Sequence, residues 1–321
     1  MQSGGRRLGV RLLVALFVAS VATFLVYVHA VDPSRLVSAF HGIGALAIAT
    51  GVVGAIGVAA LQSLRWWVVT RPILGIRYRD AFAAVLVGGF FNAVLPVRAG
   101  DAFRIDDLSR RSHASRATLL GTELIDFVMD KAGWLPAFAI LIFTGRPPIW
   151  MDRAFAAMAC IVLAAALIGA TSRGFFRRVA RERRGWMGHL AEGLMASSPR
   201  RLALAAVTIA ACPWLWEALV VWGFARMGGL ELGALQAFTV LTAFNVAAVV
   251  PAPGNFGVHE AASSATLVSF GVPLDRALAL AVAYHVTQLI PCVLGGSLVF
   301  LSRRFIASRL PSPARPPRAH E

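Results

Sequence analysis

The sequence predicts an all-α polytopic membrane protein, with about six spanning helices and two re-entrant helical hairpins arranged as an inverted repeat. Three observations predict this class: the composition, the lengths of the apolar segments, and the distribution of basic residues among the loops. Of the 321 residues, 58% are hydrophobic and only 15% are charged. A typical soluble domain has roughly 25% charged residues, so we expect this chain to lie in a membrane.

Six apolar segments are long enough to cross a bilayer, because about 20 apolar residues span ~30 Å of hydrocarbon. They cover residues 8–28, 43–61, 119–143, 154–170, 202–224 and 277–301. The first thirty residues also resemble a signal sequence, since arginines precede the apolar core and small residues follow it. The core is longer than is usual in a signal sequence, and we therefore expect it to remain as the first helix.

Two shorter apolar stretches, residues 81–95 and 235–250, are followed by proline and glycine rather than by basic residues. We interpret them as half-crossings that turn back inside the membrane. Irregular backbone at that depth is tolerated only where protein or a water-filled cavity covers it. The alternative is that they are two unrelated loops that contain proline and glycine.

The basic residues gather in alternate loops, which predicts the orientation of the chain. Five segments, 1–11, 65–79, 98–116, 173–201 and 303–318, hold 25 of the 31 lysines and arginines and are assigned to the cytoplasm. Both termini are then cytoplasmic in a cell inner membrane, and the net charge of +15 needs no nucleic acid partner. The opposite loops hold five basic residues: Arg35, Arg146, Arg153, Arg226 and Arg276.

This charge distribution requires each hairpin to leave by the side that it entered, and the two hairpins to enter from opposite sides. Residues 1–145 and 146–310 then form the two inverted halves of one membrane domain, as in many transporters. Residues 173–200 connect the halves as an amphipathic helix on the anionic lipids of the inner leaflet. Residues 311–321 are expected to form a disordered cytoplasmic tail.

Both hairpins carry residues that end a helix and expose its terminus. The first contains Asn92, Pro96, Gly100 and Asp101, and the second contains Asn245, Pro251, Pro253, Gly254 and Gly257. Proline stops the incoming half-helix, and glycine permits the turn that follows. The free N–H groups of a half-helix attract anions. We therefore expect these residues to line a cavity for the substrate.

Ionisable residues near the hairpins are further candidates for contact with the substrate. Arg98 and Arg104 suit bidentate binding of a phosphate headgroup, or they only anchor their loop at the membrane surface. Glu260 either caps the returning half-helix or holds a proton at membrane depth. His259 is a candidate partner for Glu260, because histidine titrates near neutral pH.

Glu123, Asp126 and Asp130 share one face of a predicted span, with Lys131 beside them. This face cannot point to lipid. It forms a buried ion network with Lys131 or with arginines of the first hairpin, or it lines the cavity.

The second half adds further polar residues inside its spans. Tyr284, His285 and Gln288 lie in the last span, which we expect Pro291 to kink. Glu217 is an isolated acid for which the sequence identifies no partner.

No metal or other cofactor is expected. The three cysteines, Cys160, Cys212 and Cys292, have unrelated spacings that indicate neither disulfides nor a metal cluster. Lys131 follows no glycine-rich loop, so it is not a nucleotide-binding lysine. Transport would therefore be passive or coupled to protons or ions, with Glu260, Asp101 or the Glu123 face as the carrier.

Three motifs together resemble the flippase-like membrane domain of lysylphosphatidylglycerol synthases and its stand-alone relatives. They are NAVLPVRAGDAFR at 92–104, TELIDFVMDKAG at 122–133 and PAPGNFGVHEAA at 251–262. The resemblance extends over residues 8–303, and its most specific part comprises Pro253, Gly254, Gly257 and Glu260. It implies a domain that moves an aminoacylated or other polar-headed lipid, an isoprenoid-carrier glycolipid or a hopanoid between leaflets. The catalytic domain of bifunctional members does not follow here, so we expect no aminoacyl transfer.

The leading hypothesis is a lipid translocator that is not an enzyme, with a phospholipid, glycolipid or isoprenoid lipid as its substrate. One alternative is a membrane enzyme or accessory factor that acts on lipid-linked substrates. The short outward loops and the lack of paired carboxylates or of a nucleophile with a spaced base argue against an enzyme. The other alternative is a carrier of small anions, which would use the same half-helix termini.

Overall fold

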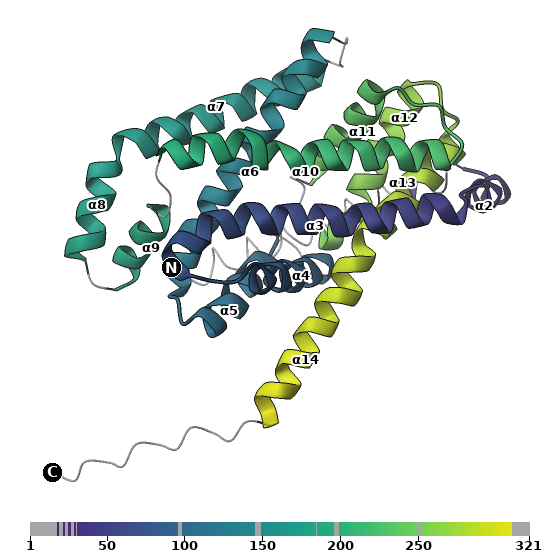
Figure 1. Ribbon diagram of the computed structural model, residues 1–321. Coiled ribbons are helices and arrows are strands. Elements are labelled where there is room, and N and C mark those ends of the chain that lie inside the picture. The colour runs from purple at the N-terminus through teal and green to yellow at the C-terminus, as the bar shows by residue number, and fades with distance from the viewer. Residues whose placement is uncertain are drawn as a thin grey trace.

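The computed structural model describes residues 18, 22, 25, 26, 29, 31–95, 98–144, 149–183, 185–195, 199–248 and 252–309. Within these residues every element is helical and no strand is present. The all-α class is therefore confirmed. Long helices lie side by side along the body of the molecule, and α8 and α9 lie at the end opposite α2 (Figure 1).

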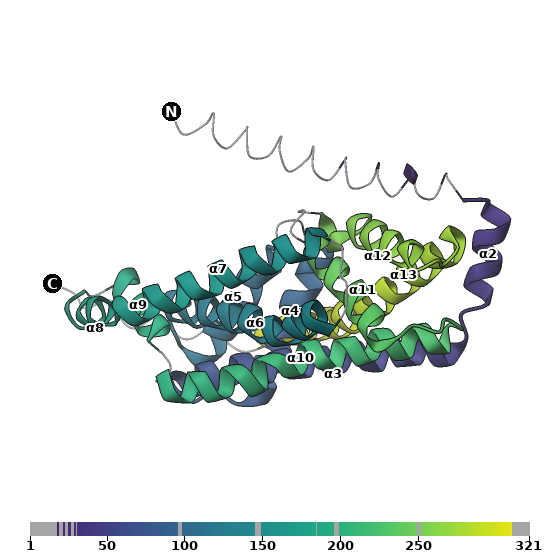
Figure 2. The same ribbon diagram turned by 90° about the horizontal axis from the view of Figure 1, so that it is seen from above.

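Two long helices, α3 (Ala45–Leu74) and α10 (Pro199–Met227), pack along each other in opposite directions (Figure 1 and Figure 2). Small residues make this approach possible. A Cβ on Gly54 would lie 2.3 Å from Cγ1 of Val220. The indole of Trp216 also donates a hydrogen bond to the carbonyl oxygen of Gly54, at 2.9 Å. Close packing over small residues is a usual way for helices to associate where lipid surrounds them.

Each predicted interruption is present as a pair of packed helices with a break between them. The first pair is α4 (Tyr78–Val94) and α5 (Gly100–Ser112). The second pair is α11 (Ala234–Ala247) and α12 (Val258–Ser269), with a short 3-10 turn, η1 (Pro253–Asn255), in the break. The re-entry of each pair into a bilayer stays a prediction.

Each pair is followed by a long helix, α6 (Arg116–Thr144) after the first and α13 (Leu274–Ile290) after the second. The contacts between the two sets are reciprocal, since α6 packs against α10 while α13 packs against α3. Each helix thus packs against the long helix of the other half, as expected if a pseudo-twofold axis relates the two halves. The division into halves at residue 145 itself stays a prediction.

Three helical segments of the described chain are long and apolar enough to span a membrane. They are Ala45–Leu74, Thr208–Met227 and Leu274–Phe305. Phe155–Thr171 and Arg173–Glu182 would together make a fourth, with a bend of 58° between them. The first predicted span, residues 8–28, lies outside the described residues apart from single positions.

The connection between the halves differs from the sequence prediction. After α7 (Ile149–Thr171) the chain forms two short helices, α8 (Arg173–Glu182) and α9 (Trp186–Leu194). The expected single amphipathic helix over residues 173–200 is therefore wrong. Gly185 precedes α9 with a φ of +103°, which L-residues other than glycine rarely adopt, and the helix cannot continue through it.

The last span changes from an α-helix to a π-helical turn at the position where a kink was expected. Pro291 begins a π-helical turn, Pro291–Gly295, that joins α13 to α14 (Gly296–Arg309). Proline cannot donate the backbone hydrogen bond of a regular helix. Beyond this turn, α14 leaves the body at an angle (Figure 1) and packs against α4. A Cβ on Gly296 would lie 2.2 Å from the carbonyl oxygen of Leu86.

Buried apolar side chains form separate clusters around the two helix pairs. One cluster joins α10, α11 and α13 with α6, and includes Trp134, Phe224 and Leu241. A second cluster surrounds the buried Trp66 and joins α3, α4, α5 and α6. Each helix break is therefore supported by its own packed region.

Candidate functional site

The first break is held together by one side chain, that of Asn92 in α4. Its Oδ1 accepts a hydrogen bond from the backbone N–H of Gly100 at 2.7 Å, and its Nδ2 donates to Asp101 at 3.1 Å. Gly100 has no room for a side chain, because a Cβ there would lie 2.0 Å from the carbonyl oxygen of Gly88. Arg98 pairs with Asp101 at 3.2 Å but is largely exposed. Pro96 lies outside the described residues.

The second break depends on residues with positive φ. Gly254 has φ +56° and Gly257 has φ +86°. Pro253 begins the 3-10 turn that contains Gly254. One carboxylate oxygen of Glu260, Oε2, accepts a hydrogen bond from the backbone N–H of Gly257 at 2.7 Å. The capping role predicted for Glu260 is thus confirmed. Pro251 lies outside the described residues.

The two breaks meet. The η1 turn of the second pair packs against α4 of the first. At this contact a Cβ on Gly254 would lie 2.9 Å from the carbonyl oxygen of Ala93. The sequence placed Asn92 and Gly254 in breaks far apart along the chain, and the structure brings these breaks together.

Glu260 has a second partner across the helix packing. Its other oxygen, Oε1, lies 2.6 Å from Nδ1 of His285 in α13, and both side chains are almost fully buried. The ring of His259 stacks against Phe244, with 3.8 Å between ring centroids, and lies 4.8 Å from the ring of His285. Within the described residues, neither ring nitrogen of His259 has a hydrogen-bond partner. We call Glu260, His259 and His285 the histidine cluster.

The acidic face of α6 is neutralised by basic residues from three helices. Arg65 of α3 binds Asp126 through Nε at 2.8 Å and Asp130 through Nη1 at 2.7 Å. Lys131 pairs with Asp130 at 2.7 Å, and Arg104 of α5 pairs with Glu123. The predicted network with Lys131 and with an arginine of the first hairpin is confirmed.

These six residues, Arg65, Arg104, Glu123, Asp126, Asp130 and Lys131, form what we call the charge network. Its three acids and three bases balance, as burial requires, because an unpaired buried charge is very unfavourable. Two of its buried atoms, Nε of Arg104 and Oε2 of Glu123, have no hydrogen-bond partner among the described residues. The guanidinium of Arg104 also lies over the ring of Trp66, 4.6 Å from its centroid.

Arg65 was missed as a site residue. The sequence assigns residues 65–79 to a connection on the cytoplasmic side, whereas α3 continues through this segment as far as Leu74. The cytoplasmic location of the segment stays a prediction. Arg65 is only 4% exposed. A signal for it was present, since a face with three acids and a single lysine requires further positive charge.

Glu217 connects the charge network to the second helix pair. It lies within electrostatic reach of Asp130 and Lys131 and near the side chain of Asn245 of α11. Asn245 also donates to the carbonyl oxygen of Leu241 at 3.0 Å. Ionisable and polar residues therefore extend from the first break to the second.

The remaining predicted residues lie around this polar interior. Gln288 points toward α3, with its Nε2 3.5 Å from the carbonyl oxygen of Gly51. The ring of Tyr284 packs between those of Phe224 and Phe244. Its hydroxyl is buried and has no hydrogen-bond partner among the described residues. In the part of the chain that the structure describes, no group of three or more histidines, cysteines and acids could hold a metal ion.

The fold and these features define a class of protein: a helical membrane protein in which two helix breaks meet and are flanked by buried charges. The family model described as the lysylphosphatidylglycerol synthase TM region matches residues 11–296. The chain therefore belongs to this family, as the motifs at both breaks indicated. No curated protein and no solved structure matches the chain.

Proposed function

We propose that the chain is a flippase-like translocator that moves a polar-headed or isoprenoid-type lipid between the leaflets of the plasma membrane. The contact between Gly254 and Ala93 carries this proposal, because it joins two helix breaks inside a helical membrane protein. In many transporters, interrupted helices meet near the midplane and form the substrate site there.

The buried polar residues support passage of a headgroup. Moving an amide or hydroxyl group out of water costs roughly 2–7 kcal/mol of free energy when it finds no new hydrogen bonds. The charge network, Glu217 and the histidine cluster offer donors and acceptors from one break to the other. Arg104 and Glu123 each keep a buried polar atom without a partner among the residues that the structure describes, and we assign them to contact with the headgroup.

The exposed surface of the helices supports a path with the lipid tails outside the protein. Leu294 of the π-helical turn and Leu298, Leu301 and Phe305 of α14 are all more than half exposed. They are spaced by three or four residues and therefore form one apolar face. We propose that acyl or isoprenoid chains stay in the bilayer against such faces while only the headgroup enters the polar interior.

We propose further that transport is driven by the substrate gradient or by protons, with the histidine cluster as the proton site. Glu260 and His285 are an acid and a base in direct contact, and His259 lies beside them with no hydrogen-bond partner in the described part of the chain. A proton can move within such a cluster without leaving an isolated charge in the interior. The charge distribution supports a cytoplasmic location for both termini.

Reconstitution of the purified chain into liposomes tests the proposal. The liposomes would carry traces of lipids with a fluorescent acyl chain, and a membrane-impermeant reductant would bleach the label in the outer leaflet. Translocation predicts that the protein makes the inner-leaflet label accessible, whereas protein-free liposomes keep it protected. Mass spectrometry of the same lipids would reveal any chemical conversion.

Three results would contradict the proposal. Protected label with every lipid headgroup tested would exclude translocation. A chemically altered lipid would favour an enzyme acting on lipid-linked substrates. Uptake of small anions into liposomes, without movement of labelled lipid, would favour an anion carrier.

A further inference from the structure

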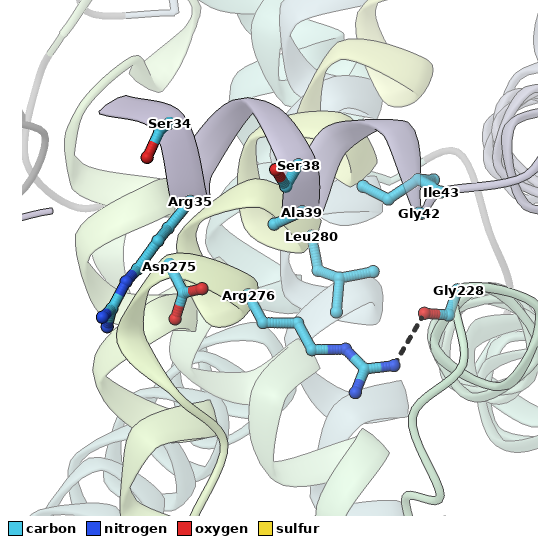
Figure 3. Close-up of a pocket in the computed structure, with 10 residues that line it drawn as sticks. All are labelled: Ser34, Arg35, Ser38, Ala39, Gly42, Ile43, Gly228, Asp275, Arg276 and Leu280. Atoms are coloured by element: carbon cyan, nitrogen blue, oxygen red, sulfur yellow. Dashed lines mark hydrogen bonds between the residues drawn. The ribbon is translucent and has the colours of Figure 1, made fainter. Parts of the chain in front are cut away.

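A pocket of about 390 Å³ lies apart from the helix breaks, where α2 (Pro33–His41) meets the start of α13 and the turn after α10 (Figure 3). Its polar lining comes from residues that are distant in sequence: Ser34, Arg35, Ser38, Asp275 and Arg276. The pocket is at the end of the molecule opposite α8 and α9 (Figure 1). None of these residues belongs to the charge network or the histidine cluster.

One wall of the pocket is a positioned arginine. Arg276 donates hydrogen bonds through Nη2 to the carbonyl oxygens of Gly228, at 3.4 Å, and of Gly229. Gly229 has a φ of +78°, so this turn depends on a glycine. A guanidinium has five N–H donors, and the turn engages only one nitrogen of it. The other donors of Arg276 are available to a ligand in the pocket.

The opposite wall contributes a second guanidinium, that of Arg35 on α2. Neither Arg35 nor Arg276 forms an ion pair with any carboxylate of the described residues. Asp275 lines the same pocket, and in Figure 3 its carboxylate points into the space between the two arginines. In Figure 3 the guanidinium of Arg35 points away from that of Arg276, and Asp275 lies between them. Two positive charges and one negative charge therefore line different parts of the same pocket, which favours a ligand that carries an anionic group.

The helix α2 gives the pocket a polar side and an apolar side. Ser34, Ser38 and Gly42 follow one another at four-residue spacing and line the pocket. Val37 and Phe40 lie on the opposite face of α2 and are 55% and 37% exposed. A short amphipathic helix of this kind lies at the boundary between headgroups and acyl chains. The neighbouring ligand is thereby expected to be a lipid.

We propose that this pocket binds the phosphate group of a lipid headgroup. Arg276 would hold the phosphate oxygens, since guanidinium groups bind phosphate through paired N–H donors. Arg35 would bind the headgroup from the other side of Asp275. The hydroxyls of Ser34 and Ser38 add donors, and Asp275 accepts a hydrogen bond from an amine or hydroxyl elsewhere in the headgroup. This inference rests on the proposed function, because it supplies a docking place for the transported lipid at one membrane surface.

Binding to the purified full chain in nonionic detergent tests the inference. The probes are dihexanoyl phosphatidylethanolamine, dihexanoyl phosphatidate, dihexanoylglycerol without phosphate, and inorganic phosphate, each titrated calorimetrically. Both phospholipids should bind and dihexanoylglycerol should not. Arg35→Gln and Arg276→Gln should each weaken binding about tenfold, as expected for loss of a charge-assisted hydrogen bond.

Two further variants sharpen the test. Asp275→Asn should weaken binding of phosphatidylethanolamine and strengthen binding of phosphatidate, because it removes a carboxylate that attracts the amine and repels the phosphate. Arg226→Gln is the matched control. Arg226 lies in the last turn of α10, over the ring of Trp222, and does not line the pocket. The Arg226→Gln substitution removes one positive charge, as the test variants do, and should leave the affinity for both phospholipids unchanged.

The outcomes separate the two proposals. Unchanged affinity for both phospholipids in the Arg35→Gln/Arg276→Gln double variant would overturn the inference. Inorganic phosphate that binds as tightly as the phospholipids, with the same dependence on arginine, would support a phosphate site and overturn its assignment to a lipid. A chain that binds phospholipid in this pocket yet moves no lipid in liposomes would contradict the proposed function alone.

Discussion

Gly254 packs directly against the backbone carbonyl of Ala93, and in this way the break between α11 and α12 touches the break that follows α4. A methyl group on Gly254 would lie 2.9 Å from that oxygen. Backbone atoms cannot move aside as a flexible side chain can. The contact therefore couples two helix pairs through residues that are about half of the chain apart.

Replacing Gly254 by alanine should abolish lipid translocation in the liposome assay. Gly75→Ala is the matched control, because Gly75 has almost the same φ, +58° against +56°, but nothing within 4 Å of its Cβ position. Both variants carry a similar backbone strain, about 1–2 kcal/mol, and should lose similar thermal stability from it. Only Gly254→Ala also disturbs the contact with Ala93. Equal activity in the two variants would refute a role for this contact.

Glu260 performs two functions that substitutions can separate. Glu260→Gln keeps an oxygen that accepts the Gly257 N–H but removes the charge beside His285. We expect this variant to fold normally, to translocate slowly, and to lose any change of rate between pH 6 and 8 that the wild type shows. Glu260→Ala should in addition lower the free energy of unfolding by about 1 kcal/mol, because the cap on the Gly257 N–H is lost. Wild-type rates at every pH in Glu260→Gln would remove Glu260 from the mechanism.

Arg65 is expected to be essential for stability. Arg65→Gln leaves Asp126 and Asp130 buried without their main partner, which should cost about 3–5 kcal/mol. Arg71→Gln is the control, because Arg71 is in the same helix but exposed. Size-exclusion chromatography after heating measures the fraction that stays folded. An additional Asp126→Asn change should restore part of the loss, and a stable Arg65→Gln protein would contradict the importance of the network.

Cysteine labelling tests the predicted re-entry and orientation. In a background without Cys160, Cys212 and Cys292, cysteines at Arg79 and His113 flank the first helix pair, and those at Glu231 and Ser269 flank the second. The first two should react with an impermeant maleimide from the cytoplasmic side only. The last two should react from the opposite side only.

Labelling of the two ends of either pair from different sides would show an ordinary full crossing. The helices could still pack as described, but the breaks would not be re-entrant. The inverted orientation of the two halves would then be lost as well.

The helix breaks could be predicted from sequence because proline and glycine act locally. Gly254 and Gly257 adopt the positive φ that their type permits, and Asn92 binds residues only eight and nine positions away. The acidic face of α6 was predictable for a similar reason, since helical periodicity alone aligns its residues.

Other features depend on contacts between distant segments. Arg65 looks like a flanking basic residue after an apolar run, and only the packing of α3 against α6 shows that it is buried among acids. The pocket between Arg35 and Arg276 joins residues from opposite ends of the chain, which no local pattern relates. Gly185 was visible in the sequence, but its effect on the helix depended on the φ that it adopts.

The π-helical turn Pro291–Gly295 has a mechanical consequence. On one side of it α13 packs against α12, and on the other side α14 packs against α4, which the turn itself also contacts. One continuous helical segment is therefore held by both helix pairs. Because Pro291 weakens the ladder of backbone hydrogen bonds there, rocking of one pair against the other would concentrate in these five residues. These residues would act as a hinge between α13 and α14.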